Sequence, residues 1–130
     1  MIDDVVVLFD IDNTLLSSLN HRVEGFSHFR AAGYDVHVRP HVLEFLTFMV
    51  NGTCPFGFWT AGTREYAMEV LDGLFQLINV ADWEERIAIV LCREDTDVVE
   101  GEYLKDMGYA QEVLQVDDIL LLDDNERHKW

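Results

Sequence analysis

Four short runs of apolar residues recur along the chain, and longer mixed segments separate them. The runs are Val5–Phe9, Phe56–Trp59, Ile87–Leu91 and Ile119–Leu122. A continuous apolar stretch of this length is typical of a strand that is buried on both faces, as in a parallel sheet. The pattern therefore predicts four central strands.

Helical spacing occurs in the segments between these runs. One set of apolar residues lies at i, i+3, i+4 and i+7 and follows Pro40, which favours a helix start: Val42, Phe45, Leu46 and Met49. The same spacing is repeated by Ala67, Val70, Leu71 and Leu74, and we expect a shorter helix over Tyr109 to Gln115. Strands that alternate with helices imply right-handed βαβ units, so the predicted fold class is α/β with a mostly parallel sheet.

Residues 15–38 do not follow this alternation. Gly25 and Gly33 interrupt the segment, and Tyr34–Val38 alternates like a half-exposed strand. We interpret the segment as a small flap or hairpin after the first strand. Because no linker or repeat divides the 130 residues, we expect a single domain over residues 1–130.

Composition narrows the class of protein. The chain is 49% hydrophobic and 26% charged, which argues against disorder, and no apolar run approaches the roughly 20 residues that span a bilayer. The acidic start of the chain differs from a secretory signal, and Cys54 and Cys92 have neither metal-site nor disulfide-framework spacing. We expect a cytoplasmic protein with no membrane segment, and a nuclear location would also fit in a eukaryotic host.

The charge of the chain restricts its partners. The formal net charge is −16, from 25 acidic and 9 basic residues. Such a charge repels nucleic acid, because affinity there comes mainly from lysine and arginine at the phosphates. We therefore expect neither long nucleic acid nor an anionic membrane as a partner. Lysine is rare, since only Lys105 and Lys129 occur, and this makes Lys105 a candidate functional residue.

Polar residues follow three of the four predicted strands. Asp10 and Asp12 follow the first, Thr60 follows the second, and Asp123 and Asp124 follow the fourth. The carboxyl ends of parallel strands share one edge of the sheet, where open α/β sheets place their chemistry. Carboxylates about 4 Å apart repel each other, and a divalent cation relieves that repulsion. Oxygen ligands suit magnesium, so the pattern predicts a magnesium site at this edge.

Each of these residues also has a plain structural explanation. Acidic pairs arise by chance in so acidic a chain, and Asp3-Asp4 and Asp117-Asp118 precede strands, which places them at the opposite edge as solvated caps. A threonine after a strand is often a helix cap, but Thr63 is available for that role and would leave the Thr60 hydroxyl free. Lys105 lies in a polar connection between strands, from which it could reach the same edge.

The residues at this edge resemble the four motifs of the haloacid dehalogenase-like superfamily. The motifs are DIDNT at Asp10–Thr14, WTAG at Trp59–Gly62, Lys105, and LLDDN at Leu121–Asn125. Three longer segments resemble the capless phosphatases related to the RNA polymerase II carboxy-terminal-domain phosphatases: Val36–Leu46, the segment that begins at Trp59, and Cys92–Met107. The resemblance implies a three-layer, Rossmann-like fold with helices on both faces of the sheet, and the spans between the motifs leave no room for a cap domain.

The resemblance also implies roles for the site residues. Asp10 would be the nucleophile that forms an aspartyl-phosphate, and Asp12 would protonate the leaving oxygen and then activate water. Thr60, Ala61 and Lys105 would bind phosphoryl oxygens. Magnesium would be held by Asp10, by the main-chain carbonyl of Asp12 and by Asp124, with Asp123 as a further candidate ligand. The implied activity is magnesium-dependent hydrolysis of a phosphomonoester.

Some positions depart from the pattern of this branch. Asn13 stands where glutamate is usual, Asp124 where asparagine is frequent, and Glu100 where the residue is often basic. Without a cap the site would suit a phosphate on a large substrate, such as a phosphoprotein side chain, although small phosphate esters remain open. Relatives continue with a further strand and helix beyond the position of Trp130. We therefore expect self-association through the uncovered edge of the last strand.

Two other readings share the fold class. A phospho-accepting receiver of a signalling system has a similar acidic magnesium pocket with a threonine and a lysine. In receivers, however, the paired acids follow the first strand and the lysine comes last, whereas here LLDDN follows Lys105. A catalytically silent binding module on the same fold is the second alternative, and the presence of both Asp10 and Asp12 argues against it.

Overall fold

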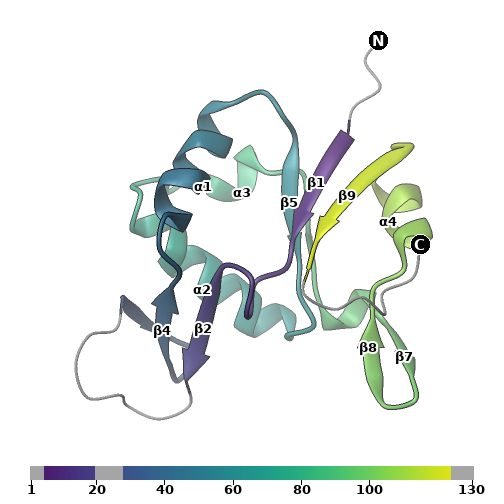
Figure 1. Cartoon of the computed structure of the whole chain (residues 1–130), viewed down its shortest axis with the longest axis horizontal. Coiled ribbons are helices and arrows are strands. Elements are labelled where there is room, and N and C mark those ends of the chain that lie inside the picture. Colours follow the sequence, from purple (N-terminus) through teal and green to yellow (C-terminus); the bar gives the residue numbers. More distant parts are fainter. Residues whose placement is uncertain (1–4, 20–27, 124–130) are drawn as a thin grey trace.

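A four-stranded parallel sheet forms the centre of the molecule (Figure 1). The computed structural model describes residues 5–19 and 28–123. The strand order is β6-β5-β1-β9, with bounds β1 Val5–Phe9, β5 Phe56–Trp59, β6 Val90–Leu91 and β9 Asp118–Leu122. All three pairings are parallel, as the apolar runs predicted. The third strand is shorter than expected, because only the last two residues of the run from Ile87 to Leu91 pair with β5.

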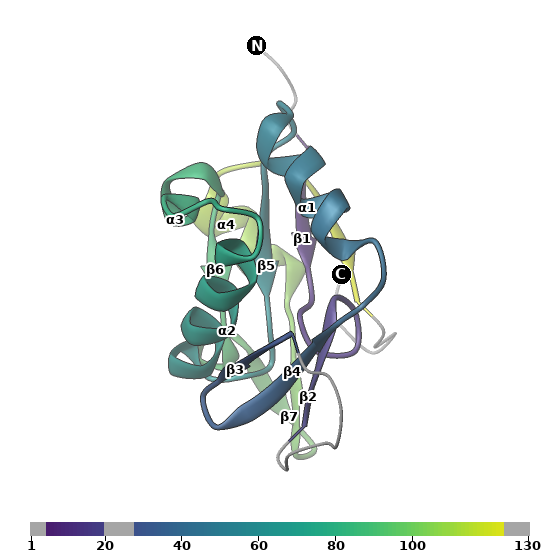
Figure 2. The same ribbon diagram turned by 90° about the vertical axis from the view of Figure 1, so that its left-hand side faces the viewer.

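Helices cover both faces of this sheet (Figures 1 and 2). One face carries α1 (Val42–Asn51), α2 (Arg64–Gln76) and the short α3 (Trp83–Arg86), and the other carries α4 (Met107–Leu114). Both longer helices were expected, and α4 begins two residues before its predicted start. The three-layer α/β arrangement is therefore confirmed. Within the described ranges, none of the helices is long and apolar enough to cross a membrane.

The core is divided by the sheet into two clusters. Successive side chains of a strand point to opposite faces. Val6 and Leu8 of β1 accordingly pack with Met107 and Ala110 on the side of α4. Phe9 belongs to the larger cluster on the side of α1 and α2. Burial on both faces explains why the central strands read as continuous apolar runs and not as alternating patterns.

The predicted flap is a three-stranded antiparallel sheet. Its strand order is β2-β4-β3, with bounds β2 Leu16–Leu19, β3 Phe29–Ala31 and β4 Tyr34–Val38. The flap is docked on α2, because the Ala32 N–H donates to the Glu69 carboxylate at 2.6 Å. The ring of Phe29 lies so close to Gly73 that a Cβ there would come within 2.5 Å of it. Between β1 and β5 the described residues form this flap and α1, with no further domain among them.

A second hairpin was not expected from the sequence. It consists of β7 (Asp97–Val99) and β8 (Glu102–Leu104), and it follows the 3-10 helix η1 (Arg93–Asp95). Its strands have only three residues each, which is too short for the apolar pattern by which a strand is recognised. Glu100 and Gly101 form its turn with φ angles of 50° and 81°, as two-residue hairpin turns require. The hairpin leads directly into Lys105.

Candidate active site

Asp10 and Asp12 lie in a tight turn that begins where β1 ends. The Leu15 N–H donates to the Ile11 carbonyl at 2.9 Å, and the Asn13 N–H donates to the Leu16 carbonyl at 2.8 Å. Asn13 has a φ of 64°, a left-handed conformation that asparagine tolerates better than most residues. Arg39, which directly follows β4, holds this turn, because its Nη2 donates to the Asn13 carbonyl at 2.6 Å. The local backbone therefore fixes both carboxylates at the carboxyl edge of the sheet.

Lys105 reaches this edge and joins two of the predicted carboxylates. Its side chain is 1% exposed, and its Nζ donates to Asp10 Oδ1 at 3.1 Å and also to Asp123 Oδ2. A buried ammonium needs such partners, since an unpaired buried charge is very costly. The cluster joins the ends of β1 and β9, as the parallel topology predicted.

The electrostatics of this cluster are dominated by burial. Removal from water raises the pKa of Asp10 from 3.8 to about 6, because desolvation disfavours the charged carboxylate. The ammonium of Lys105 opposes this rise in pKa, and the carboxylate of Asp123 adds to it. One cation therefore only partly compensates two carboxylates at this point.

Thr60 lies at the end of β5, the strand beside β1, where Phe58 is in register with Phe9. Its side chain is buried, and its Oγ1 accepts the N–H of Gly62 at 3.0 Å, which uses a lone pair of the hydroxyl and not its proton. We expected the Thr60 hydroxyl to be free, whereas its oxygen accepts this hydrogen bond; its proton can still be donated. Thr63 caps α2 as predicted, since its Oγ1 accepts the N–H of Tyr66 at 3.3 Å.

Arg93 fastens the turn after Thr60. Its Nε donates to the carbonyl of Ala61 at 2.8 Å, and its own N–H donates to the carbonyl of Gly62 at 2.8 Å. The guanidinium lies over the ring of Tyr103, 4.6 Å from the ring centre. The predicted phosphate-binding turn is therefore connected through Arg93 to the β7–β8 hairpin.

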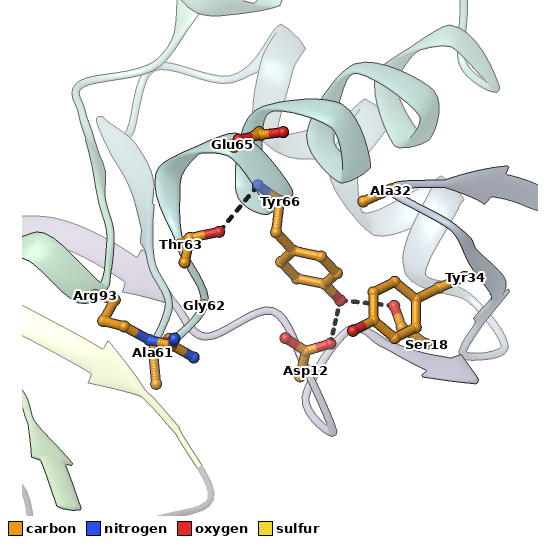
Figure 3. Close-up of a pocket in the computed structure, with 10 residues that line it drawn as sticks. All are labelled: Asp12, Ser18, Ala32, Tyr34, Ala61, Gly62, Thr63, Glu65, Tyr66 and Arg93. Atoms are coloured by element: carbon orange, nitrogen blue, oxygen red, sulfur yellow. Dashed lines mark hydrogen bonds between the residues drawn. The ribbon is translucent and has the colours of Figure 1, made fainter. Parts of the chain in front are cut away.

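Asp12 faces a pocket of about 630 Å³ beside the flap (Figure 3). The hydroxyl of Tyr66 donates to Asp12 Oδ1 at 2.6 Å and lies 2.6 Å from the hydroxyl of Ser18. Burial raises the pKa of Asp12, while the Tyr66 hydrogen bond and the charge of Lys105 lower it. Burial and the neighbouring Asp12 raise the pKa of the Tyr66 phenol above its usual range, so Tyr66 remains a donor.

The predicted site residues therefore gather at one edge of the sheet. Asp10, Lys105 and Asp123 are in direct contact, and Asp12, Thr60 and Ala61 lie in the two adjoining turns. Asp124 lies outside the described residues. The pocket also holds residues that were not singled out from the sequence, namely Tyr66 and Arg93. Their only signal was their place within the longer segments that resemble the capless phosphatases.

The donor set at this edge fits a hard cation in part. Asp10 and Asp123 supply carboxylate oxygens, which magnesium prefers, and part of the raised pKa of Asp10 comes from Asp123. A second positive charge would relieve that repulsion. Within residues 5–19 and 28–123, no group of three or more acidic, histidine or cysteine side chains could hold a metal ion. The predicted third ligand, Asp124, is outside these ranges.

Comparisons with known proteins agree with this geometry. The chain matches the family model of the NLI interacting factor-like phosphatases over residues 5–130. Curated proteins gave no match. Two similar solved structures are a fission yeast RNA polymerase II CTD phosphatase, a variant of Fcp1 bound to beryllium fluoride (17% identity, TM-score 0.58), and Fcp1, an essential RNA polymerase II CTD phosphatase (19% identity, TM-score 0.61).

These similarities differ in what they establish. The chain is covered to 94% by each of the two structures but spans only 37% of either one, and at these identities they establish the fold alone. The family model covers nearly all of the chain. It confirms the resemblance that the motifs around Asp10, Thr60, Lys105 and Asp123 indicated. The chain therefore belongs to the NLI interacting factor-like phosphatases of the haloacid dehalogenase-like superfamily.

Proposed function

We propose that this protein is a magnesium-dependent phosphomonoester hydrolase that acts through an aspartyl-phosphate on Asp10. The observation that carries the proposal is the contact between Asp10 and Lys105 at the carboxyl end of β1. A carboxylate at this place can attack phosphorus, and a buried ammonium beside it can neutralise the oxygens of the transferring group. Membership of a phosphatase family supports the same reaction.

The first half of the reaction transfers the phosphoryl group to the protein. An oxygen of the Asp10 carboxylate attacks phosphorus and forms a new O–P bond, while the bond from phosphorus to the leaving oxygen breaks. Asp12 gives its proton to that leaving oxygen, and its raised pKa favours the protonated form that this step needs. Lys105 and Thr60 bind the phosphoryl oxygens, whose charge must be held in place during transfer.

The second half returns the protein to its starting state. Asp12, now a carboxylate, takes a proton from a water molecule whose oxygen attacks phosphorus. The bond to Asp10 breaks, and inorganic phosphate leaves. Asp10, Asp123 and Asp124 would hold magnesium together with the main-chain carbonyl of Asp12. A bound magnesium ion would supply positive charge that reduces the repulsion between the Asp10 carboxylate and the phosphoryl oxygens.

The proposed substrate is a phosphate on a protein side chain. Among the described residues, the flap and the β7–β8 hairpin flank the catalytic edge, and no further domain closes over it. The site is therefore accessible to a phosphate that protrudes from a large molecule. The net charge of −16 and Glu100 in the hairpin turn disfavour substrates that carry many phosphates.

The experiment is a phosphatase assay with 4-nitrophenyl phosphate and magnesium. Asp10→Asn is expected to reduce hydrolysis to the background rate, and EDTA is expected to do the same until magnesium is restored. Asp118→Asn, an exposed aspartate at the start of β9, is the matched control and should keep full activity. Undiminished hydrolysis by Asp10→Asn would refute the proposal.

The same contacts would also serve a phospho-accepting receiver, because Asp10, Lys105 and Thr60 are common to both kinds of site. The lifetime of the phosphoryl group on Asp10 distinguishes the two functions. After incubation with acetyl phosphate, a receiver would retain a stable phosphoryl group on Asp10. A hydrolase would release phosphate in repeated turnovers, and this is the outcome that we expect. A protein that neither accepts nor releases phosphate would be a silent binding module.

A further inference from the structure

The hydroxyl of Tyr66 lies between the side chains of Asp12 and Ser18 (Figure 3). It donates to Asp12 Oδ1 at 2.6 Å and is 2.6 Å from Ser18 Oγ. Because the Tyr66 proton goes to the carboxylate, Ser18 is the donor in the second bond. The chain of donors therefore runs from Ser18 on the flap, through Tyr66 on α2, to Asp12 after β1.

The ring that carries this hydroxyl is held in place. It packs edge to face against Tyr34, with ring centres 5.6 Å apart and planes at 85°. On the other side it lies against the turn after β5, where a Cβ on Gly62 would come within 2.8 Å of it. Contacts on two sides thus hold the ring, so the fold determines the position of its hydroxyl.

The hydrogen bond has a consequence for the carboxyl group of Asp12. It occupies one oxygen, Oδ1, and no hydrogen bond is drawn from Tyr66 to the other oxygen (Figure 3). A general acid must present its proton along a defined direction, and errors of about 1 Å in such placement can cost about 10²-fold in rate. An Asp12 side chain without this bond could rotate among several rotamers.

We propose that Tyr66 is a positioning residue that holds the Asp12 carboxyl group for proton transfer to the leaving oxygen, and that Ser18 anchors the Tyr66 hydroxyl. This inference rests on the proposed phosphatase function. In this role Tyr66 does not only line the pocket, because its hydroxyl affects the reaction by orienting Asp12. It also makes the flap part of the catalytic apparatus, since Ser18 belongs to β2.

Dependence on the leaving group separates this role from a merely structural one. A phenol with strongly electron-withdrawing substituents leaves without much help from an acid, whereas a poor leaving group needs its proton. Loss of acid positioning must therefore slow phosphoryl transfer from esters with poor leaving groups far more than from esters with good ones. The ratio kcat/KM reports only the steps up to formation of the aspartyl-phosphate, so it isolates the step in which the leaving oxygen is protonated.

The experiment measures kcat/KM for a series of substituted phenyl phosphates of similar size with the wild-type protein and with Tyr66→Phe. We expect about a 10- to 100-fold loss for the poorest leaving groups and less than about 3-fold for 4-nitrophenyl phosphate, because misplacing the acid removes only part of the roughly 10²- to 10⁴-fold that a general acid contributes. The plot of log kcat/KM against leaving-group pKa should therefore become steeper. Ser18→Ala should show the same trend with a smaller amplitude.

Tyr34→Phe is the matched control, because it removes a hydroxyl from the neighbouring ring of the same pocket. It should leave the slope of the wild-type plot unchanged. An equal loss of kcat/KM for all leaving groups with Tyr66→Phe would overturn the positioning role and leave the proposed hydrolase intact. Absence of hydrolysis by the wild-type protein with every ester would refute the hydrolase and the positioning role together.

Discussion

Asp10, Lys105 and Asp123 concentrate three charged groups at one point where little water reaches them. Lys105 contacts both carboxylates, yet burial still raises the pKa of Asp10 to about 6. The arrangement is therefore not optimised for the stability of the metal-free protein. It fits a site that uses further positive charge from a cation and from its own lysine to handle the negative phosphoryl group.

This imbalance predicts a pH-dependent gain in stability for Asp10→Asn. The folded protein binds the Asp10 proton more tightly than the unfolded chain does, so the contribution of Asp10 to stability falls as pH rises from about 4 to about 6 and is constant above. In EDTA at pH 7.5, the free energy of unfolding of Asp10→Asn should exceed that of the wild type by about 1–3 kcal/mol. Urea unfolding at pH 7.5 and pH 4.5 measures the difference.

The gain should be much smaller at pH 4.5, where the Asp10 carboxyl group is mostly neutral in the folded wild type as well. Asp118→Asn controls for the loss of one negative charge, since Asp118 is exposed. Added magnesium should stabilise the wild type and not Asp10→Asn. A variant that is less stable than the wild type at pH 7.5 would show that the bond from Lys105 outweighs the cost of burying Asp10.

Some of these site residues could be predicted from the sequence and others could not, for a physical reason. Asp10, Thr60 and Asp123 follow apolar runs, so the parallel topology alone brings them to one edge. Tyr66 and Arg93 act on groups that are 54 and 32 residues away in the chain. Such contacts depend on how α2 and η1 pack against the turns, and no local pattern records that packing.

At the scale of elements, the β7–β8 hairpin links Lys105 to the predicted phosphate-binding turn. Tyr103 of β8 lies under the guanidinium of Arg93, and Arg93 holds the carbonyl of Ala61. The same hairpin leads into Lys105, which reaches Asp10. This hairpin was missed from the sequence, because strands of three residues are too short for a strand pattern to be recognised. Its position in the fold nevertheless determines two parts of the site.

Arg93→Gln should therefore weaken substrate binding more than protein stability. Glutamine cannot stack on Tyr103 as a cation and is too short to reproduce the reach of the guanidinium to Ala61. We expect kcat/KM for 4-nitrophenyl phosphate to fall about 5- to 30-fold, as for loss of about 1–2 kcal/mol of transition-state stabilisation. Steady-state kinetics and a thermal unfolding curve of each variant provide the measurement.

Arg86→Gln is the matched control for this prediction. Arg86 is an arginine at the end of α3 that pairs with Asp82 at 3.0 Å and is outside the site. It should leave kcat/KM unchanged. If Arg93→Gln kept the wild-type value, the turn after Thr60 would be held by its backbone hydrogen bonds alone, and the hairpin would act only by placing Lys105.

At the scale of the whole molecule, β9 is the last strand of the four-stranded sheet. It pairs with β1 along its whole length, and within the described residues no strand pairs with its outer edge. Leu120 is 47% exposed and Leu122 is 40% exposed, so the edge combines backbone donors and acceptors with apolar side chains. Edges of this kind are templates for pairing with another strand. In the strand order, β9 lies beside β1 on the side away from β5.

We propose that copies of the chain associate through the β9 edge. The net charge of −16 opposes the approach of two copies, so association should strengthen as salt screens that repulsion. Sedimentation velocity over a range of protein concentrations, at low and at high salt, should show a dimer fraction that grows with concentration and with salt.

Leu120→Lys should abolish this dimer, because a lysine on an edge strand places an unpaired charge in the interface. Val98→Lys on β7, where valine is 67% exposed, adds the same charge elsewhere and should leave the dimer unaffected. A monomer at all concentrations and salt levels would contradict the proposal, and equal loss of the dimer in both lysine variants would assign association to overall charge instead of this edge.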